Sequence, residues 1–305
     1  MDFLKLIRYK NLLMVLLTMV LTKYALIHSF IKSSYLSDFY FSILTLSVLL
    51  ITAGGYIIND IYDVEADKIN KPNKLFIDKT ISKKRAWTTY FILTFMGLIL
   101  GVFLSIFKLL PFYSLYFIFT IIGLFFYSKN LKKQILIGNI LVSFFVGLTI
   151  FLLISFELDN HFETPNEGIS NAFNMLFPFW YVIGYSFFAF LTTFVREIIK
   201  DIEDVNGDLK LKSNTLPIII GRKRASKIAF FFSAVLLVFL LIILQIIKSN
   251  ILILGYGIIF ILAPLLYFLY KLWFSKSKQD YSHLSNILKI IMLFGILSML
   301  LFAIN

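Results

Sequence analysis

The sequence predicts an all-α membrane protein in which nine transmembrane helices form a single polytopic domain over residues 1–305. Three observations indicate this fold class. Hydrophobic residues make up 59% of the chain and charged residues only 15%, whereas a soluble domain is about half apolar and a quarter charged. The apolar residues gather in nine runs, each about as long as a helix that crosses a bilayer. An acidic motif that follows the second run is repeated after the sixth.

The nine apolar runs are the expected elements of the fold. The candidate spans lie at about 11–32, 38–60, 86–107, 110–128, 135–157, 172–197, 225–247, 250–273 and 284–304. The basic N-terminus resembles the start of a signal peptide, but the run after it is long and contains no evident small-residue cleavage site. The first run is therefore expected to be a retained span.

The basic residues predict the orientation of the spans. The N-terminus and the alternate segments 61–85, 129–134, 196–227 and 271–289 contain 25 of the 29 Lys and Arg residues. By the positive-inside rule the N-terminus and both acidic motifs lie in the cytoplasm, and the segment from Glu157 to Ser170 lies outside. In a bacterial cell this means the inner membrane. The net charge of +12 does not indicate a nucleic-acid partner, because the basic residues sit in short loops between apolar spans.

The first acidic motif directly follows the second span. Asn59, Asp60, Asp63 and Asp67 share one face if this segment is helical. Carboxylates so close together repel one another and need cations, either basic side chains or a divalent metal. Oxygen ligands alone suit a hard ion such as Mg²⁺, which usually fills its remaining positions with substrate phosphate and water.

The second acidic motif has the same spacing. Asp201, Asp204 and Asp208 each lie 141 residues after their counterparts. A solvated loop is the ordinary explanation of one such cluster, but two clusters in register favour a paired metal site. The offset also predicts a parallel four-helix pseudo-repeat, with a ninth helix appended, that places the two clusters face to face around a central cavity. Calcium loops of the EF-hand type are excluded by the spacing.

Other polar residues near the span ends are candidates for binding a phosphorylated ligand. Arg196 and Lys200 precede the second motif, where they either hold phosphate oxygens or extend toward the membrane surface. Tyr127 and Lys132 follow the fourth span on the same predicted side. Lys23 lies inside the first span, and a charge within the membrane is a functional candidate by default.

Zinc and disulfide chemistry is not expected, because the chain has no Cys and its three His residues are far apart. Asn139, just inside the fifth span, is expected to hydrogen-bond to another helix or to line the cavity. A stripe of Phe in the sixth span is expected to pack in the bundle or to line an apolar tunnel.

Together these motifs resemble the UbiA superfamily of intramembrane prenyltransferases. The pattern N-D-x-x-D-x-x-x-D matches residues 59–67, D-x-x-D-x-x-x-D matches residues 201–208, and Y-S-x-x-L-K matches residues 127–132. The resemblance implies a nine-helix bundle and Mg²⁺-dependent transfer of a prenyl group from a polyprenyl diphosphate to a lipophilic acceptor, with no protein partner implied. Asp63, Asp67, Asp204, Asp208 and Lys132 are then the candidate catalytic residues. Asn59, Tyr127, Lys132, Arg196 and Lys200 would bind the diphosphate, while Asn59 and all six motif Asp residues are candidate metal ligands.

The segment after the first motif is similar to digeranylgeranylglyceryl phosphate synthases and chlorophyll synthases. Within it Lys74 stands where that subgroup has Arg, and Lys does not make a bidentate contact. The acceptor implied is a prenylglyceryl phosphate, with Arg8, Asn11, Lys74 and Asn139 as candidate contacts. The alternatives are an aromatic acceptor of quinone biosynthesis (hydroxybenzoate or dihydroxynaphthoate), a cation-coupled membrane transporter and a non-catalytic scaffold.

Overall fold

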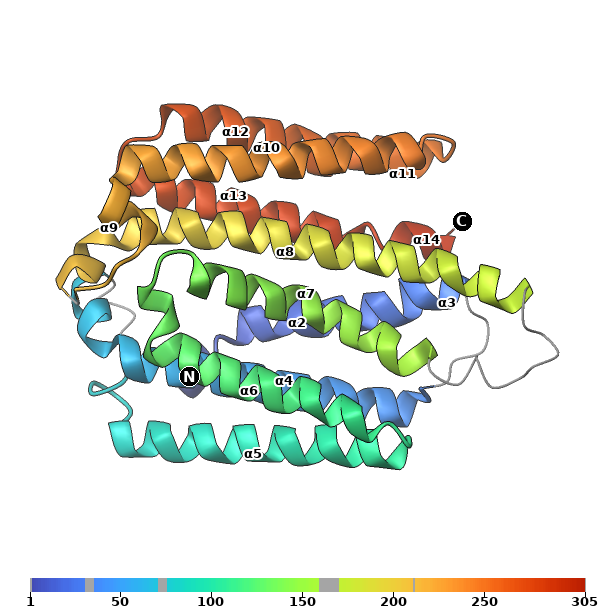
Figure 1. Cartoon of the computed structure of the whole chain (residues 1–305), viewed down its shortest axis with the longest axis horizontal. Helices are drawn as coiled ribbons and strands as arrows, with labels where there is room; N and C mark the ends of the chain where they lie inside the picture. The colour runs from blue at the N-terminus through green and yellow to red at the C-terminus, as the bar shows by residue number, and fades with distance from the viewer. Residues whose placement is uncertain (1, 31–35, 71–75, 159–169, 211, 305) are drawn as a thin grey trace. The chain divides into compact units, whose positions relative to one another are not determined.

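Long apolar runs form helices in a membrane because the backbone there must satisfy its own hydrogen bonds. The computed structural model describes residues 2–30, 36–70, 76–158, 170–210 and 212–304 (Figure 1). Within these ranges nine helices are long and apolar enough to cross a membrane, which confirms the predicted fold class. They span Tyr9–Phe30, Asp38–Asn70, Lys83–Phe107, Pro111–Lys129, Ile137–Glu157, Pro178–Lys210, Arg222–Ile246, Ile251–Phe274 and Lys278–Ile304.

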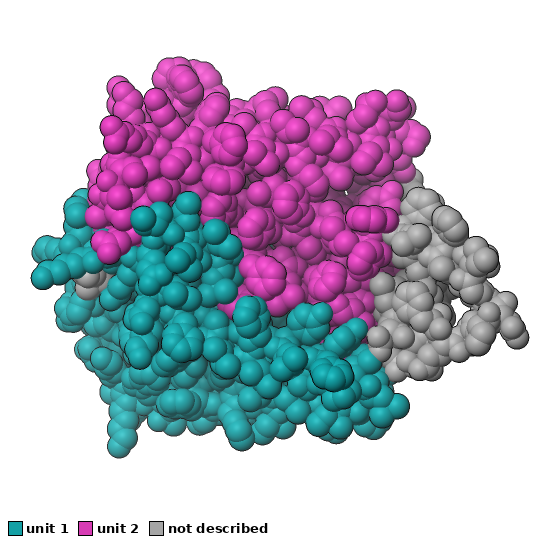
Figure 2. All heavy atoms as spheres, in the orientation of Figure 1, with its two compact units in different colours: residues 1–19, 35–141, 206–213 teal, residues 20–34, 142–205, 214–305 magenta. Residues whose placement is uncertain are grey.

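The chain divides into two compact units, which Figure 2 shows in different colours. Unit 1 consists of residues 1–19, 35–141 and 206–213, and unit 2 of residues 20–34, 142–205 and 214–305. The boundaries between the units fall inside several long helices, so the units do not correspond to two consecutive halves of the sequence.

Unit 1 contains α4 (Asp38–Asn70), the helix that carries the first acidic motif, and several shorter helices. It includes α1 (Asp2–Leu6), most of α2 (Tyr9–Leu21), α5 (Lys83–Phe107), α6 (Ser114–Lys129) and the 3-10 turns η3 (Pro111–Tyr113) and η4 (Leu131–Lys133). α4 packs against α5 and α6. The approach to α5 is close at Gly97, whose carbonyl accepts a hydrogen bond of 2.7 Å from the Ser47 hydroxyl. A Cβ at position 97 would lie 2.8 Å from Cγ1 of Ile51, so the contact requires glycine.

Unit 2 contains most of the remaining helices. They are η1 (Thr22–Ile27), α3 (His28–Phe30), most of α7 (Ile137–Leu158) and of α8 (Ser170–Lys210), α9 (Leu216–Ile220), α10 (Arg222–Ile246), α11 (Ile251–Tyr256), η5 (Gly257–Leu262), α12 (Ala263–Phe274), α13 (Lys278–Leu297) and α14 (Leu300–Ile304). α12 packs against both α10 and α13, and α14 packs against η1. Ser277 begins α13 with a capping box in which its side chain and that of Asp280 satisfy each other's backbone N–H groups.

Two helices extend further than the predicted spans. α4 continues to Asn70 instead of ending near residue 60, and α8 continues to Lys210 instead of ending near residue 197. The 33 residues of α4 measure about 50 Å along the helix axis, which exceeds the roughly 30 Å hydrocarbon layer. Both acidic motifs therefore lie within these helices. The predicted spans ended near or before the first residues of the motifs.

The structure also changes the predicted environment of Glu157. The sequence placed this residue at the start of an outer polar segment, but its side chain in α7 is 2% exposed and lies 3.8 Å from Nζ of the fully buried Lys23. Lys23 belongs to the π-helical turn η1. Burial favours this pairing because either charge alone would be strongly destabilised in an apolar interior. The rest of the predicted outer segment, residues 159–169, lies outside the described residues.

Candidate active site

The first acidic motif lies on one face of α4 because the opposite face is held in an apolar core. Ile57, Ile61 and Val64 follow the helical repeat and are buried, together with Ala86 and Tyr90 of α5. Their burial turns the polar side chains of the same segment away from the core. Those side chains, which are partly exposed, belong to Asn59, Asp60, Asp63 and Asp67. The predicted common face of the motif is thus present in the fold.

Lys132 is bound directly by this acidic face. Its Nζ lies 2.5 Å from Oδ1 of Asp63 and 3.1 Å from Oδ1 of Asn59, and the amide of Asn59 donates to Oδ2 of Asp63 at 2.7 Å. Lys132 sits in η4, which α7 approaches closely at Gly138, where a Cβ would lie 2.6 Å from the Lys132 Cα. Burial lowers the pKa of Lys132, and the charge of Asp63 opposes this shift.

Arg8 pairs with a second carboxylate of the motif. Its Nη2 donates to Oδ1 of Asp60 at 2.6 Å, and its guanidinium lies 5.1 Å from the centre of the Tyr56 ring. Arg8 has a positive φ of 51° at the break between α1 and α2, and its carbonyl accepts a hydrogen bond of 2.8 Å from the backbone N–H of Asn11. Burial opposes protonation of Arg8, but the charge of Asp60 and its hydrogen bond outweigh this effect and raise the pKa of Arg8.

The second acidic motif lies on one face of α8, and each of its three carboxylates is partly exposed. Asp201 and Asp204 belong to unit 2, whereas Asp208 belongs to unit 1. Within unit 1 the backbone N–H of Gly207 donates to Oδ1 of Asn70 at 3.0 Å, so the last turns of α4 and α8 are in contact. A side chain at position 207 would collide with the Asn70 amide. Motif spacing does not predict this contact, because its partners are 137 residues apart.

The basic residues before the second motif share one carboxylate. Arg196 Nη1 donates to Oε1 of Glu197 at 2.9 Å, and Lys200 Nζ lies 3.3 Å from Oε2 of the same residue. The Glu197 side chain is 10% exposed. Glu197 therefore holds Arg196 and Lys200, the two predicted phosphate contacts, beside the second motif. The sequence pattern did not indicate this role of Glu197.

The remaining predicted residues lie on other helices or outside the described residues. Tyr127 lies at the end of α6 and is partly exposed, whereas Asn139 in α7 is 5% exposed. Lys74 lies outside the described residues, so its predicted contact with the acceptor stays a prediction.

A divalent cation of the predicted kind needs several oxygen donors close together. In the part of the chain that the structure describes, no three His, Cys, Asp or Glu side chains form a ready-made metal site. The ammonium of Lys132 nevertheless occupies a cation position formed by two side-chain oxygens, from Asn59 and Asp63. Oxygen donors of this type are the ligands of Mg²⁺, so the residues present fit the predicted metal.

Comparison with known proteins agrees with the sequence motifs. A model of the UbiA prenyltransferase family matches residues 12–296. The digeranylgeranylglyceryl phosphate synthase of Methanosphaera stadtmanae is 33% identical over 257 residues, which are 83% of this chain and 84% of that protein. The chain spans 61% of the length of the digeranylgeranylglyceryl phosphate synthases of Sulfurisphaera tokodaii and Saccharolobus solfataricus.

Solved structures show the same fold. A structure that concerns digeranylgeranylglyceryl phosphate synthase in membranes has a TM-score of 0.69 at 26% identity, over 99% of this chain and 98% of that one. A UbiA homologue from Archaeoglobus fulgidus bound to GPP and Mg²⁺ has a TM-score of 0.59 at 17% identity, over 98% of this chain and 99% of that one. Because the family model covers nearly the whole chain, this protein belongs to the UbiA prenyltransferase family.

Proposed function

We propose that this protein transfers a prenyl group from a polyprenyl diphosphate to the free hydroxyl of a prenylglyceryl phosphate, at the cytoplasmic side of the membrane. The name of the relatives at 33–38% identity supports this acceptor. The observation that carries the proposal is the cluster on α4, where Asn59 and Asp63 hold the ammonium of Lys132 within 3.1 Å. Such a cluster combines oxygen ligands for a cation with a basic group for a phosphate.

We assign the metal ligands by motif. Asn59, Asp63 and Asp67 would hold one Mg²⁺, and a second set, Asp201, Asp204 and Asp208, would hold another. Bound Mg²⁺ would supply positive charge against the diphosphate oxygens. Asp60 is bound to Arg8, so we assign it the role of orienting that guanidinium.

The reaction begins with the breaking of the bond between C1 of the donor and its bridging oxygen, whose electron pair leaves with the diphosphate. Lys132, Arg196 and Lys200 donate to the oxygens on which this charge develops. The acceptor hydroxyl oxygen then forms an ether bond to C1, and its proton leaves with the diphosphate. Tyr127, at the end of α6, is assigned a further hydrogen bond to the leaving group.

Arg8 is the proposed contact for the phosphate of the acceptor. The side chain is 37% exposed although Nη2 is bound by Asp60, and a guanidinium has further N–H donors that a phosphate could accept from. Asn11 at the start of α2 and the buried Asn139 are assigned polar contacts to the same molecule, as is Lys74.

The test uses purified protein in detergent with geranylgeranyl diphosphate, geranylgeranylglyceryl phosphate and Mg²⁺. We expect ether product and diphosphate in equal amounts, no turnover in excess chelator, and a loss of about a hundredfold or more in Asp63→Asn. Asp78→Asn, a change of the same chemistry in an exposed turn, is the matched control and should retain activity. Full turnover in chelator would refute the metal assignment. Product formed only with 4-hydroxybenzoate, or transport of substrate without release of diphosphate, would refute the proposed reaction.

A further inference from the structure

The C-terminal part of unit 2, residues 214–305, is strongly basic. It contains nine Lys and Arg residues but only one acidic residue, Asp280. The carboxylate of Asp280 accepts hydrogen bonds of 3.0 and 2.8 Å from the backbone N–H groups of Lys276 and Ser277, so it serves as part of a helix cap. This part of the chain therefore carries a large excess of positive charge.

Most of that charge lies at one end of unit 2. Seven of the nine cations fall between residues 222 and 227, where α10 begins, or between residues 271 and 278, where α12 ends and α13 begins. α10 and α12 lie side by side (Figure 1), and the ring centroids of Phe230 and Trp273 are 5.3 Å apart. The hydroxyls of Ser226 in α10 and Tyr281 in α13 lie 2.9 Å apart. Like charges gathered in this way repel one another, and an anion that binds among them relieves the repulsion.

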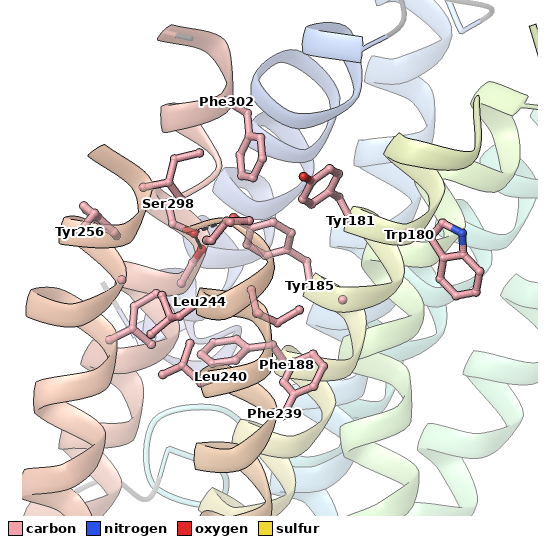
Figure 3. Close-up of a pocket in the computed structure, with 17 residues that line it drawn as sticks. Trp180, Tyr181, Tyr185, Phe188, Phe239, Leu240, Leu244, Tyr256, Ser298 and Phe302 are labelled. Carbon is pink, nitrogen blue, oxygen red and sulfur yellow. Dashed lines mark hydrogen bonds between the residues drawn. The ribbon is translucent and has the colours of Figure 1, made fainter. Parts of the chain in front are cut away.

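Two of these cations stand at the end of an exposed apolar stripe on α10. Arg224 and Lys227 are exposed, and Phe231 and Val238 follow them on the same face of the helix with 61% and 56% exposure. The opposite face of α10, which includes Leu240, lines a pocket inside unit 2 (Figure 3). The stripe therefore points away from the interior of the unit.

The length of the stripe matches one leaflet of a bilayer. Val238 follows Lys227 by 11 residues, which is about 16 Å along a helix. Half of the hydrocarbon layer measures roughly 15 Å, and α10 is long and apolar enough to cross that layer. A ligand that fits carries an anion at one end and a hydrocarbon chain of this length. An acidic soluble protein would meet the cations but not the apolar stripe.

We infer that this stripe binds an anionic phospholipid of the surrounding bilayer. The phosphate lies at Arg224 and Lys227, and one chain of the lipid lies along Phe231 and Val238. An Arg side chain binds phosphate through two parallel N–H donors, and a Lys side chain adds a point charge. This lipid site uses none of the residues assigned to the reaction, so it does not depend on the proposed function.

Trp273 makes binding at this site measurable, because it is 66% exposed and its ring contacts Phe230 beside the stripe. Replacing Trp87 and Trp180 with Phe leaves Trp273 as the only tryptophan of the chain. In vesicles, phosphatidylglycerol with brominated chains should quench Trp273 at about one fifth of the mole fraction required for brominated phosphatidylcholine. Each cation near an anionic headgroup is expected to contribute a factor of about five to the preference.

The variants change charge at the stripe without changing its shape. Arg224→Gln/Lys227→Gln should reduce the preference for phosphatidylglycerol by about threefold or more. Arg224→Lys/Lys227→Arg keeps both charges and should retain the preference. Lys248→Gln, the matched control, removes an exposed cation just beyond the other end of α10 and should retain it too.

Equal quenching by the two lipids, or a preference unchanged in Arg224→Gln/Lys227→Gln, would overturn the inference. A shift of Trp273 emission by polyglutamate together with equal quenching by the two lipids would assign the cations to an acidic protein and also overturn it.

A second measurement needs no replacement of tryptophan. A ligand that binds only the folded state raises the Tm. In detergent, added phosphatidylglycerol should raise the Tm of the unmodified protein more than phosphatidylcholine does. This difference should shrink in Arg224→Gln/Lys227→Gln and persist in Lys248→Gln. The same difference in both variants would contradict a lipid site at Arg224 and Lys227.

Discussion

Replacing Lys23 with Met is expected to destabilise the protein strongly, because it removes a cation that pairs with the buried carboxylate of Glu157. Lys23 is 0% and Glu157 2% exposed, at a distance of 3.8 Å. Removing one member of a buried pair costs about 3–5 kcal/mol, whereas replacing both members with apolar residues of similar size is close to neutral. We therefore expect Lys23→Met to lose about 3–5 kcal/mol and the double variant Lys23→Met/Glu157→Met to recover most of it.

The control for this experiment is an exposed pair with better geometry. Nζ of Lys68 lies 2.6 Å from Glu65, but the two side chains are 49% and 68% exposed. Distance alone would make the pair of Lys68 and Glu65 the stronger one. Water screens this exposed pair, so Lys68→Met should cost much less unfolding free energy than Lys23→Met. The free energy of unfolding is measured in mixed micelles by titration with a denaturing detergent, followed by circular dichroism. Equal losses in the two single variants, or additive effects of Lys23→Met and Glu157→Met, would refute the reasoning from burial.

Two further predictions concern helix contacts within unit 1. Asn70→Ala removes the acceptor of the buried Gly207 N–H and should cost about 1–3 kcal/mol of unfolding free energy. Asn70→Asp keeps an acceptor oxygen and should cost less. Equal losses in the two variants would contradict the role of this hydrogen bond. Gly97→Ala places a methyl group 2.8 Å from Ile51 Cγ1 and should destabilise by about 1–3 kcal/mol. Gly255→Ala meets no atom within 4 Å, so a loss equal to that of Gly97→Ala would exclude steric crowding as the cause.

The sequence predicted the spans well but placed the ends of α4 and α8 too early. Hydropathy reports where apolar residues stop, and helices continue past that point when one face remains packed. In α4 the buried Ile57, Ile61 and Val64 continue the helical repeat through the acidic motif. That spacing of four and three residues is visible in the sequence and was the available signal. The apolar core it forms keeps the carboxylates on an ordered face.

For the candidate site, the sequence predicted which residues share a face but not which residues they contact. Spacing along α4 placed Asp60 and Asp63 together, and the repulsion between them indicated a need for cations. The structure supplies two such cations from distant segments, Arg8 at a separation of 52 residues and Lys132 at 69. Spacing within one helix carries no information about such partners, because tertiary packing brings them together.

Motif spacing does not say which acidic residue pairs with Lys23, but the cost of a charge inside the membrane restricts the candidates. A lysine inside a membrane span needs a nearby anion, and the chain has 17 acidic residues. Within the predicted spans only Asp38, Asp60, Glu157 and Glu197 are acidic. Lys23 lies past the middle of the first span, so the residues at its level come from the starts of even-numbered spans and the ends of odd-numbered ones. That criterion leaves Asp38 and Glu157. In the structure Asp38 is exposed and Glu157 is buried. Tertiary packing therefore decides that Glu157 is the partner of Lys23, and their pairing offsets the cost of removing both charges from water.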